Sequence, residues 1–414
     1  MTFASRSLLA LAAAVPLASA LDVADADFKL GLKMQLQVRA EKGWADGTDN
    51  KRYDTATGSA DSEPDDMEFY IRRARIGFAG TYKDVYRFAY IIRNDNQDKA
   101  GSATSPTNRM PETHVAYLAR DFKGDKGTQQ IRAGLDYAFF NGAVLNSGGW
   151  SPMVAARATE QSAMVAPRGV GVGYKFIGSK VIVGVDIQNN SNTGGTSGDS
   201  SNSAANGVTD NGEGLFYGSR VEYIAFDDAE KPHMKPQESF LGAAGKGVLV
   251  SFDLGVNQND NTDNDTTVTT TATGAEIFVH MDALTAVAEY RYAHAATKSA
   301  VAANGDVDRK IWLVQAAYAM PKGDFIFEPG LRFTRIDLND DTEEESSYGS
   351  SEYGGSGYQW DLGVTMYINK NANKVAVGYQ HWRSEGGEQA SVVPNPATGD
   401  SKANIVRAQW SFAF

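Results

Sequence analysis

The stretch FKLGLKMQLQV, residues 28–38, alternates strictly between apolar and polar side chains. One face carries Phe28, Leu30, Leu32, Met34, Leu36 and Val38, and the other carries Lys29, Lys33, Gln35, Gln37 and Arg39. Successive side chains of an extended strand point to opposite faces, so this period of two predicts a β-strand with one apolar face. The pattern returns in NIVRAQWSFAF, residues 404–414, where the chain stops on an aromatic residue.

The same alternation recurs between these two ends. It predicts strands at 67–82, 85–94, 112–119, 129–137, 168–177, 179–189, 213–226, 246–257, 273–282, 284–294, 308–320, 323–337, 356–369 and 372–384. With the two terminal strands, the prediction is an all-β chain of about sixteen antiparallel strands. An even number of this size is typical of a bacterial transmembrane β-barrel.

The connections between these strands alternate in length. Short turns are predicted at Lys83-Asp84, Asp121 to Gly127, Gly178-Ser179, Asp282-Ala283, Pro321 to Gly323 and Lys370-Asn371. Longer polar loops are predicted near 41–66, 95–111, 138–167, 190–212, 258–272, 295–307, 338–355 and 385–402. Outer-membrane barrels have short periplasmic turns and long extracellular loops, which this order reproduces. Residues 227–245 break the order, because a long segment stands where a short turn is expected, and they leave the strand count ambiguous.

The first twenty residues, MTFASRSLLALAAAVPLASA, have an early cation, a short apolar run and a small-residue end. This pattern predicts a cleaved signal peptide over residues 1–20, followed by one barrel domain over 21–414. Beyond it, no run approaches the roughly 18 apolar residues of a membrane-spanning helix. The chain has no cysteine and a formal charge of -12, which argues against disulfides, cysteine-ligated metals and nucleic acid as a partner.

The polar faces of the predicted strands carry many charges, including Lys29, Lys33, Arg39, Arg73, Arg75, Arg87, Arg132, Lys175, Arg220, Arg332 and Arg407 beside Glu222, Asp253, Glu276, Glu289 and Asp361. In a soluble sandwich of two sheets, the apolar faces would pack on each other instead of facing lipid. Burying unpaired charges costs several kcal/mol each, so we expect this face to be wet. A sixteen-stranded barrel is wide enough for an aqueous channel.

Several segments resemble the phosphate-selective porin O/P family. They are FYIRRARIGFAGTY (69–82), PRGVGVGYKF (167–176), IWLVQAAYAMPKGDFIFEPGLRF (311–333), YQWDLGVTMYINKNANKVAVGY (358–379) and the terminal VRAQWSFAF. The resemblance implies a trimer of sixteen-stranded barrels in the Gram-negative outer membrane, in contact with lipid and lipopolysaccharide. It also implies a third loop folded into each lumen, here about 138–167, and passive diffusion with a bias toward anions.

The resemblance also implies site residues. We expect the pore to be lined by Lys33, Arg73, Arg75, Arg87, Arg132, Arg220, Arg332 and Arg407. The constriction loop offers Arg157 and Arg168 beside Glu160, where the family has a lysine cluster, so phosphate specificity stays open. An inward arginine that pairs with a neighbouring carboxylate to brace the wall is the alternative reading for each of these positions.

The function that these patterns favour is a water-filled, weakly anion-selective porin for small hydrophilic solutes, with no cofactor and no metal. Its five histidines show no spacing of a catalytic triad or a metal pair, so we expect no enzyme. An adhesive or structural surface protein with an incidental pore, and a sheath for an electron carrier, remain alternatives. The run from Asn259 to Asp265 lacks the glycine and distal glutamate of a calcium loop, so Ca²⁺ binding there is a minor possibility.

Overall fold

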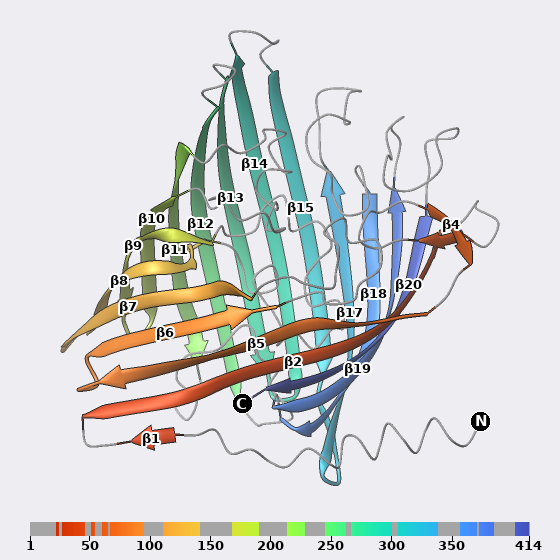
Figure 1. Ribbon diagram of the computed structural model, residues 1–414, viewed down its shortest axis with the longest axis horizontal. Coiled ribbons are helices and arrows are strands. Elements are labelled where there is room, and N and C mark those ends of the chain that lie inside the picture. The colour runs from red at the N-terminus through yellow and green to blue at the C-terminus, as the bar shows by residue number, and fades with distance from the viewer. Residues whose placement is uncertain are drawn as a thin grey trace.

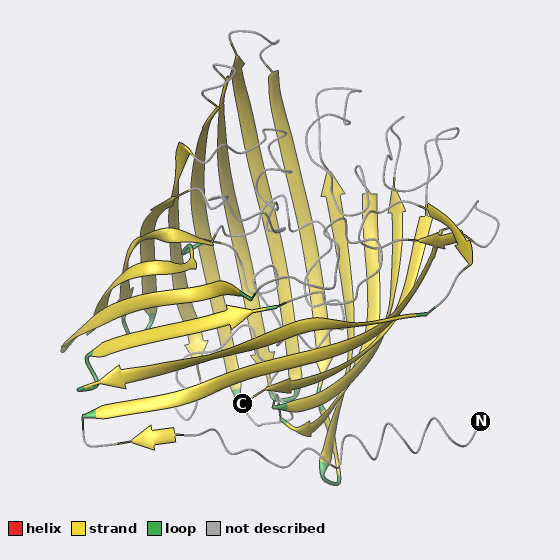
Figure 2. Cartoon of the chain, viewed as in Figure 1, coloured by secondary structure: helices red, strands yellow, loops and turns green. Residues whose placement is uncertain are grey.

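Sixteen antiparallel strands close into a barrel (Figure 1). The computed structural model describes residues 22–24, 27–45, 51–53, 60–64, 67–94, 111–140, 168–189, 213–227, 245–261, 266–299, 305–337, 357–370, 372–384 and 402–413. Figure 2 shows that the regular elements of these residues are strands. Among the same residues, no helix is long and apolar enough to cross a membrane. Three parts of the prediction lie outside the described residues. They are the signal peptide, residues 228–244 and most of loop 138–167.

Each strand of the wall pairs with its neighbours in the chain. The wall strands are β2 (Phe28–Ala45), β5 (Glu68–Tyr82), β6 (Tyr86–Arg93), β7 (Glu112–Gly124), β8 (Gly127–Tyr137), β9 (Arg168–Ile177), β10 (Val181–Asn189), β11 (Glu213–Asp227), β12 (Lys246–Asn261), β13 (Thr266–Met281), β14 (Leu284–Ser299), β15 (Gly305–Tyr318), β17 (Phe325–Asp337), β18 (Gly357–Asn369), β19 (Asn373–Ser384) and β20 (Lys402–Ala413). Shorter strands are β1 (Asp22–Ala24), β3 (Lys51–Tyr53), β4 (Ala60–Pro64) and β16 (Met320–Lys322). All sixteen predicted strands are therefore present.

The last strand closes the barrel against the first. β20 pairs with β2 from Gln35↔Ala413 to Ala45↔Ala403. Arg39 donates a hydrogen bond of 2.7 Å to Gln409, which lies 370 positions away in the chain. The alternation seen at both ends of the sequence thus belongs to two neighbouring strands of one wall.

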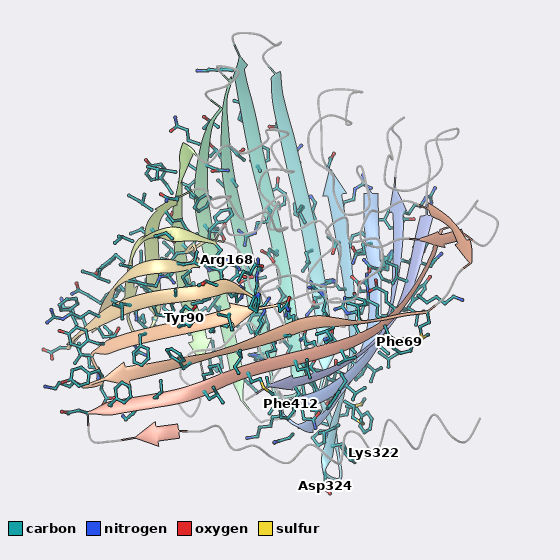
Figure 3. The ribbon with its side chains drawn as sticks, in the orientation of Figure 1. Phe69, Tyr90, Arg168, Lys322, Asp324 and Phe412 are labelled. Carbon is teal, nitrogen blue, oxygen red and sulfur yellow. The ribbon has the colours of Figure 1, made fainter. Side chains whose placement is uncertain are left out.

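The wall is apolar outside and polar inside. Large apolar side chains such as Leu118 (69% exposed), Phe69 (65%) and Phe252 (61%) lie on the outer surface, where Figure 3 shows Phe69 and Tyr90. The inner face of the wall carries many buried polar side chains, such as Gln37, Arg332 and Thr334, which have no exposed surface. This is the reverse of a soluble protein, and it is the arrangement of a barrel whose outer face meets lipid.

Tight turns join the strands at the periplasmic end. Three residues join β5 to β6, and Lys83 and Asp84 both have positive φ (53° and 51°) in a turn that the Val85 N–H closes by donating to the Tyr82 carbonyl at 3.2 Å. Lys29 Nζ donates a hydrogen bond of 2.8 Å to Asp84 Oδ1, and this contact lowers the pKa of Asp84. The turns predicted near 178, 282 and 370 are likewise confirmed by the strand ends.

Two predicted turns were placed wrongly. β7 runs to Gly124, which pairs with Gly127, so the turn is Asp125-Lys126 rather than Asp121 to Gly127. Pro321 belongs to β16, and the hairpin that β16 forms with β17 turns at Gly323, where φ is 62°. Figure 3 shows this hairpin, with Lys322 and Asp324 at its tip, extending beyond its neighbours.

The predicted loops 258–272 and 295–307 were also wrong over most of their length. β12, β13 and β14 extend well past the predicted ends, with pairs such as Gln258↔Thr269 and Thr267↔Lys298. Threonine has a high strand propensity, but these residues are polar on both faces and show no alternation. The physical reason is that strands beyond the lipid need no apolar face. The tall wall that results is visible at β12 to β15 in Figure 1.

Candidate functional site

Ion pairs cover the inner face of β11 to β14. Arg220 donates to Glu222 (2.7 Å), Asp253 (3.0 Å) and Glu276 (2.9 Å). Arg291 lies 2.6 Å from Glu289 and also donates to the second oxygen of Asp253. We call these six residues the ion-pair network. Asp253 joins its two arginines, because each of its oxygens accepts from one guanidinium.

The network is buried and carries no excess of positive charge. Arg291 is 1% exposed and Asp253 is 6% exposed. Gly274 stands opposite Arg291 in the strand register. A Cβ at Gly274 would overlap the guanidinium of Arg291, so only glycine leaves room for that side chain. Two guanidiniums, of Arg220 and Arg291, stand against the four carboxylates of Glu222, Asp253, Glu276 and Glu289. This wall therefore gives little attraction to anions.

Other inward arginines of the predicted set also hold carboxylates. Arg332 donates to Asp361 at 2.9 Å, and Arg407 donates to Glu41 at 2.5 Å across the closing seam. Arg132 pairs with Asp136, and its guanidinium lies 3.8 Å from Asp186. Near the periplasmic end, Arg87 pairs with Asp121 at 2.6 Å while about half of its side chain stays exposed, and Lys33 is exposed on the same inner face. These pairs brace the wall.

A different arrangement occupies the inner wall from β5 to β9. The guanidiniums of Arg73, Arg75, Arg93 and Arg168 lie close enough to His114 to act on it electrostatically. Arg168 is hydrogen-bonded to His114 Nδ1, and Arg75 stands directly opposite Arg93 in the strand register. We call these four arginines and His114 the arginine cluster. Figure 3 shows Arg168 beside the ends of β6 and β7 that lie near the middle of the view.

Within the described part of the chain, two carboxylates are recorded beside this cluster. Glu112 accepts a hydrogen bond of 2.7 Å from Arg93. Asp136, which pairs first with Arg132, also interacts with Arg168. Like charges placed directly opposite each other in a sheet destabilise it, as Arg75 and Arg93 do here. The cluster is thus a local concentration of positive charge that costs stability to maintain.

Two β-bulges lie in the strands that carry the arginine cluster. In β5 the register passes from Arg73 to Ile71, so Arg72 is an extra residue, and in β7 it passes from Val115 to Thr113, so His114 is extra. A bulge bends a strand and redirects its side chains. Because of the first bulge, Tyr70 and Arg73 both face inward although their parities differ, and both are buried.

The chain that leaves β8 turns inward onto the wall. The Phe139 N–H donates to Asp186 at 2.9 Å, and its ring lies against Gly173 and Gly184. The Phe140 ring is 3% exposed and packs edge-on against Phe216 at 5.7 Å between centroids. We call Phe139 and Phe140 the phenylalanine anchor. It fixes the start of segment 138–167 to the inner wall.

The structure distributes the predicted site residues as follows. Arg73, Arg75 and Arg168 meet in the arginine cluster, although Arg168 begins β9 rather than standing in the loop. Arg157 and Glu160 lie outside the described residues. Sequence reasoning missed Arg93 and Arg291, although strand parity places both on the inner face. It also missed His114, which a bulge places there and alternation does not reveal.

Comparisons with known proteins agree with this architecture. The family model described as "Phosphate-selective porin O and P" matches residues 47–414. No curated protein matches the chain. The anion-selective porin from Comamonas acidovorans is a similar solved structure, with a TM-score of 0.53 at 12% identity over 94% of this chain and 100% of that chain.

Two further solved structures are similar. The outer membrane channel DcaP of Acinetobacter baumannii has a TM-score of 0.54 at 14% identity, over 94% of this chain and 99% of that chain. The outer membrane protein OmpT of Vibrio cholerae, in its trimer form, has a TM-score of 0.52 at 12% identity, over 94% of this chain and 100% of that chain. At these identities the likeness establishes a shared fold.

Proposed function

The chain belongs to the phosphate-selective porin O and P family, and from that premise we propose an anion-selective channel whose selectivity comes from the arginine cluster. The protein is a porin of the Gram-negative outer membrane. The observation that carries the proposal is the contrast between two inner walls. Among the residues that the structure describes, arginines outnumber carboxylates around His114, whereas carboxylates outnumber arginines in the ion-pair network.

Fixed charge acts on ions that pass through a narrow aqueous path. A unit charge about 8 Å from the path changes the energy of a passing ion by roughly 0.5 kcal/mol at the dielectric constant of water. Each guanidinium thus favours an anion about twofold and disfavours a cation about twofold, before screening by salt. The planar donor fork of arginine also suits the oxygens of phosphate. The cluster is therefore suited to attract chloride and oxyanions.

Removing two charges of the arginine cluster is expected to weaken anion selectivity. In the double variant Arg75→Gln/Arg168→Gln, the ratio of chloride to potassium permeability should fall at least about fivefold, because anions lose attraction and cations lose repulsion. The measurement is the reversal potential of the reconstituted protein in a planar bilayer across a KCl gradient, repeated with potassium phosphate.

A matched control changes the same charge elsewhere. Lys322→Gln/Lys370→Gln removes two exposed cations of the periplasmic turns, and its reversal potential should stay near that of the wild type. An unchanged selectivity in the cluster variant would overturn the role of the arginine cluster. A properly folded wild type that does not conduct would instead favour a surface or adhesive protein over a channel.

The remaining sequence expectations enter as parts of the same proposal. Residues 1–20 form the cleaved signal peptide, and residues 21–414 form one barrel domain. Segment 138–167 is the constriction loop, which is supported by the inward path of the phenylalanine anchor. The family and the fold support a channel rather than an enzyme.

A homotrimer is also proposed, with the outer surface of β5 and β6 in its interface. β6 has 8 residues, fewer than the roughly 9 to 11 that a tilted strand needs to cross a membrane. This low wall carries neighbouring rings on its outer surface, with Phe78 5.8 Å from Tyr90 and Phe28 5.9 Å from Phe88. Because these strands are short, they fit the thickness of the lipid layer poorly. A second protomer would cover their aromatic outer face in place of lipid. OmpT of Vibrio cholerae, which has a similar fold, is described in a trimer form.

The substitution Tyr90→Arg is expected to dissociate the trimer, since a guanidinium in an aromatic interface loses its hydration. Native mass spectrometry should report three copies for the wild type and one for this variant. Ile277→Arg places the same charge on the outer surface of β13, on the opposite side of the sixteen-stranded wall, and should remain trimeric. A monomeric wild type, or a trimeric Tyr90→Arg protein, would contradict this interface.

A further inference from the structure

Aromatic and cationic residues alternate along one row of the outer surface. Tyr290 pairs in register with Trp312, Trp312 with Arg335, Arg335 with Tyr358, and Tyr358 with Arg383. We call these five residues the outer row. It crosses β14, β15, β17, β18 and β19.

Strand parity places the outer row on the lipid side of the wall. Leu313, Thr334 and Gln359, the chain neighbours of opposite parity, are buried, whereas Trp312 is 55% exposed. Side-chain contacts also connect residues of the outer row on neighbouring strands. The Tyr290 and Trp312 rings lie 4.2 Å apart, and Arg383 donates to the Tyr358 hydroxyl at 3.4 Å.

At Arg335, Tyr358 and Arg383, the outer row lies at the boundary between the apolar band and the extracellular loops. Toward the periplasm, the outer surface of the same strands and of β15 carries exposed apolar side chains, at Val314, Leu331, Leu362, Val364 and Val377. On the other side, β17 ends two residues beyond Arg335 and β19 ends one residue beyond Arg383. The row is therefore at the depth of the lipid headgroups of the outer leaflet, where aromatic belts occur.

The charge near the outer row is positive on balance. The described cations on this outer surface are Lys298, Lys310, Arg335 and Arg383, and the acids are Asp308 and Asp337. Asp308 already accepts hydrogen bonds from Tyr292 (2.9 Å) and from the His294 ring (2.7 Å). Asp337 stands opposite Lys310 in the register. Among the side chains that the structure describes on this surface, cations thus exceed acids, which favours an anionic ligand.

We propose that the outer row is a binding site for the phosphate groups of the phosphorylated glycolipid of the outer leaflet, lipopolysaccharide. Arg335 and Arg383 present planar donor forks that suit phosphate oxygens. The flanking rings of Trp312 and Tyr358 offer flat faces for the sugars, and the apolar band receives the acyl chains. The site rests on the outer-membrane location of the protein and is independent of its ion selectivity.

The test measures binding of purified bisphosphorylated lipid A to the detergent-solubilised porin by native mass spectrometry. Arg335→Gln/Arg383→Gln should bind this lipid at least about tenfold more weakly than the wild type, because charge-assisted hydrogen bonds to its phosphates are lost. Dephosphorylated lipid A should bind the wild type and the variant equally weakly. Inorganic phosphate in large excess should leave the lipid bound, since it lacks the acyl chains.

Arg120→Gln is the matched control. Arg120 is also an outward arginine between aromatic rings, 4.7 Å from the Phe122 centroid and 5.5 Å from that of Tyr86, but it lies at the periplasmic end. Its variant should bind lipid A as the wild type does. The proposal would be overturned if the double variant bound bisphosphorylated lipid A as tightly as the wild type does. It would also be overturned if the wild type bound dephosphorylated lipid A as tightly as the bisphosphorylated lipid, or if inorganic phosphate displaced the lipid. Reversal potentials of the same samples, which this site leaves unchanged, test the channel separately.

Discussion

Replacement of Arg291 by methionine is expected to destabilise the barrel by about 3–5 kcal/mol, the usual effect of removing one member of a buried ion pair. The substitution leaves Asp253 and Glu289 buried beside an apolar side chain. Asp253 keeps Arg220 as a partner, but Glu289 loses the guanidinium that lies 2.6 Å away. The measurement is guanidinium-induced unfolding of the protein in lipid vesicles, followed by tryptophan fluorescence.

Two further variants show whether burial causes this loss. Lys29→Met removes a cation whose side chain is 59% exposed and whose partner Asp84 is 57% exposed, and its cost should stay within about 1 kcal/mol. Arg291→Met/Glu289→Leu removes both charges of the pair, so it should be more stable than Arg291→Met alone. A cost for Arg291→Met no larger than that for Lys29→Met would contradict the ion-pair network as a stabilising element.

Removal of the phenylalanine anchor is expected to raise single-channel conductance and to cost about 3 kcal/mol or more in stability. In Phe139→Ala/Phe140→Ala, the backbone that enters segment 138–167 loses two rings that pack on the inner wall. If that segment narrows the lumen, its release widens the path for ions. Single-channel recordings in planar bilayers measure the conductance directly.

The receiving surface offers an independent way to displace the same anchor. A Cβ at Gly184 would lie 2.8 Å from the Phe139 ring, so Gly184→Leu should raise the conductance without removing any ring. Phe122→Ala changes an aromatic residue of the outer surface and should leave the conductance unchanged. Wild-type conductance in both inner variants would show that the anchor does not hold the constriction loop.

The strands were predictable because their outer face meets lipid and their inner face carries charge. Apolar and polar residues therefore alternate along each strand with a period of two. The period holds from Leu32 to Glu41 in β2 and from Val406 to Phe412 in β20, and both strands appear where the alternation places them, although β2 continues to Ala45, inside the predicted loop 41–66. The Thr-rich start of β13 was not predictable in this way, since beyond the lipid neither face must be apolar. Pro321 misled the turn prediction because a proline at a strand edge needs no ladder hydrogen bond.

The candidate site was predictable only in part. Parity correctly places Arg220 and Arg332 on the inner face, but it does not reveal which carboxylate faces each one. Those partners come from neighbouring strands, and pairs such as Arg220 with Glu276 depend on the register of three strands. The arginine cluster was hidden further, because the bulges at Arg72 and His114 shift parity in the strands that carry it.

The seam between β2 and β20 has a consequence for how the barrel folds. Glu41 and Arg407, 366 positions apart, meet only after nearly the whole chain is present. Loop-closure entropy makes such contacts slow to form, and until then β2 keeps an unpaired edge open to other strands. The nascent porin must therefore be held unfolded until β20 arrives, and the search for this one seam sets the pace of assembly.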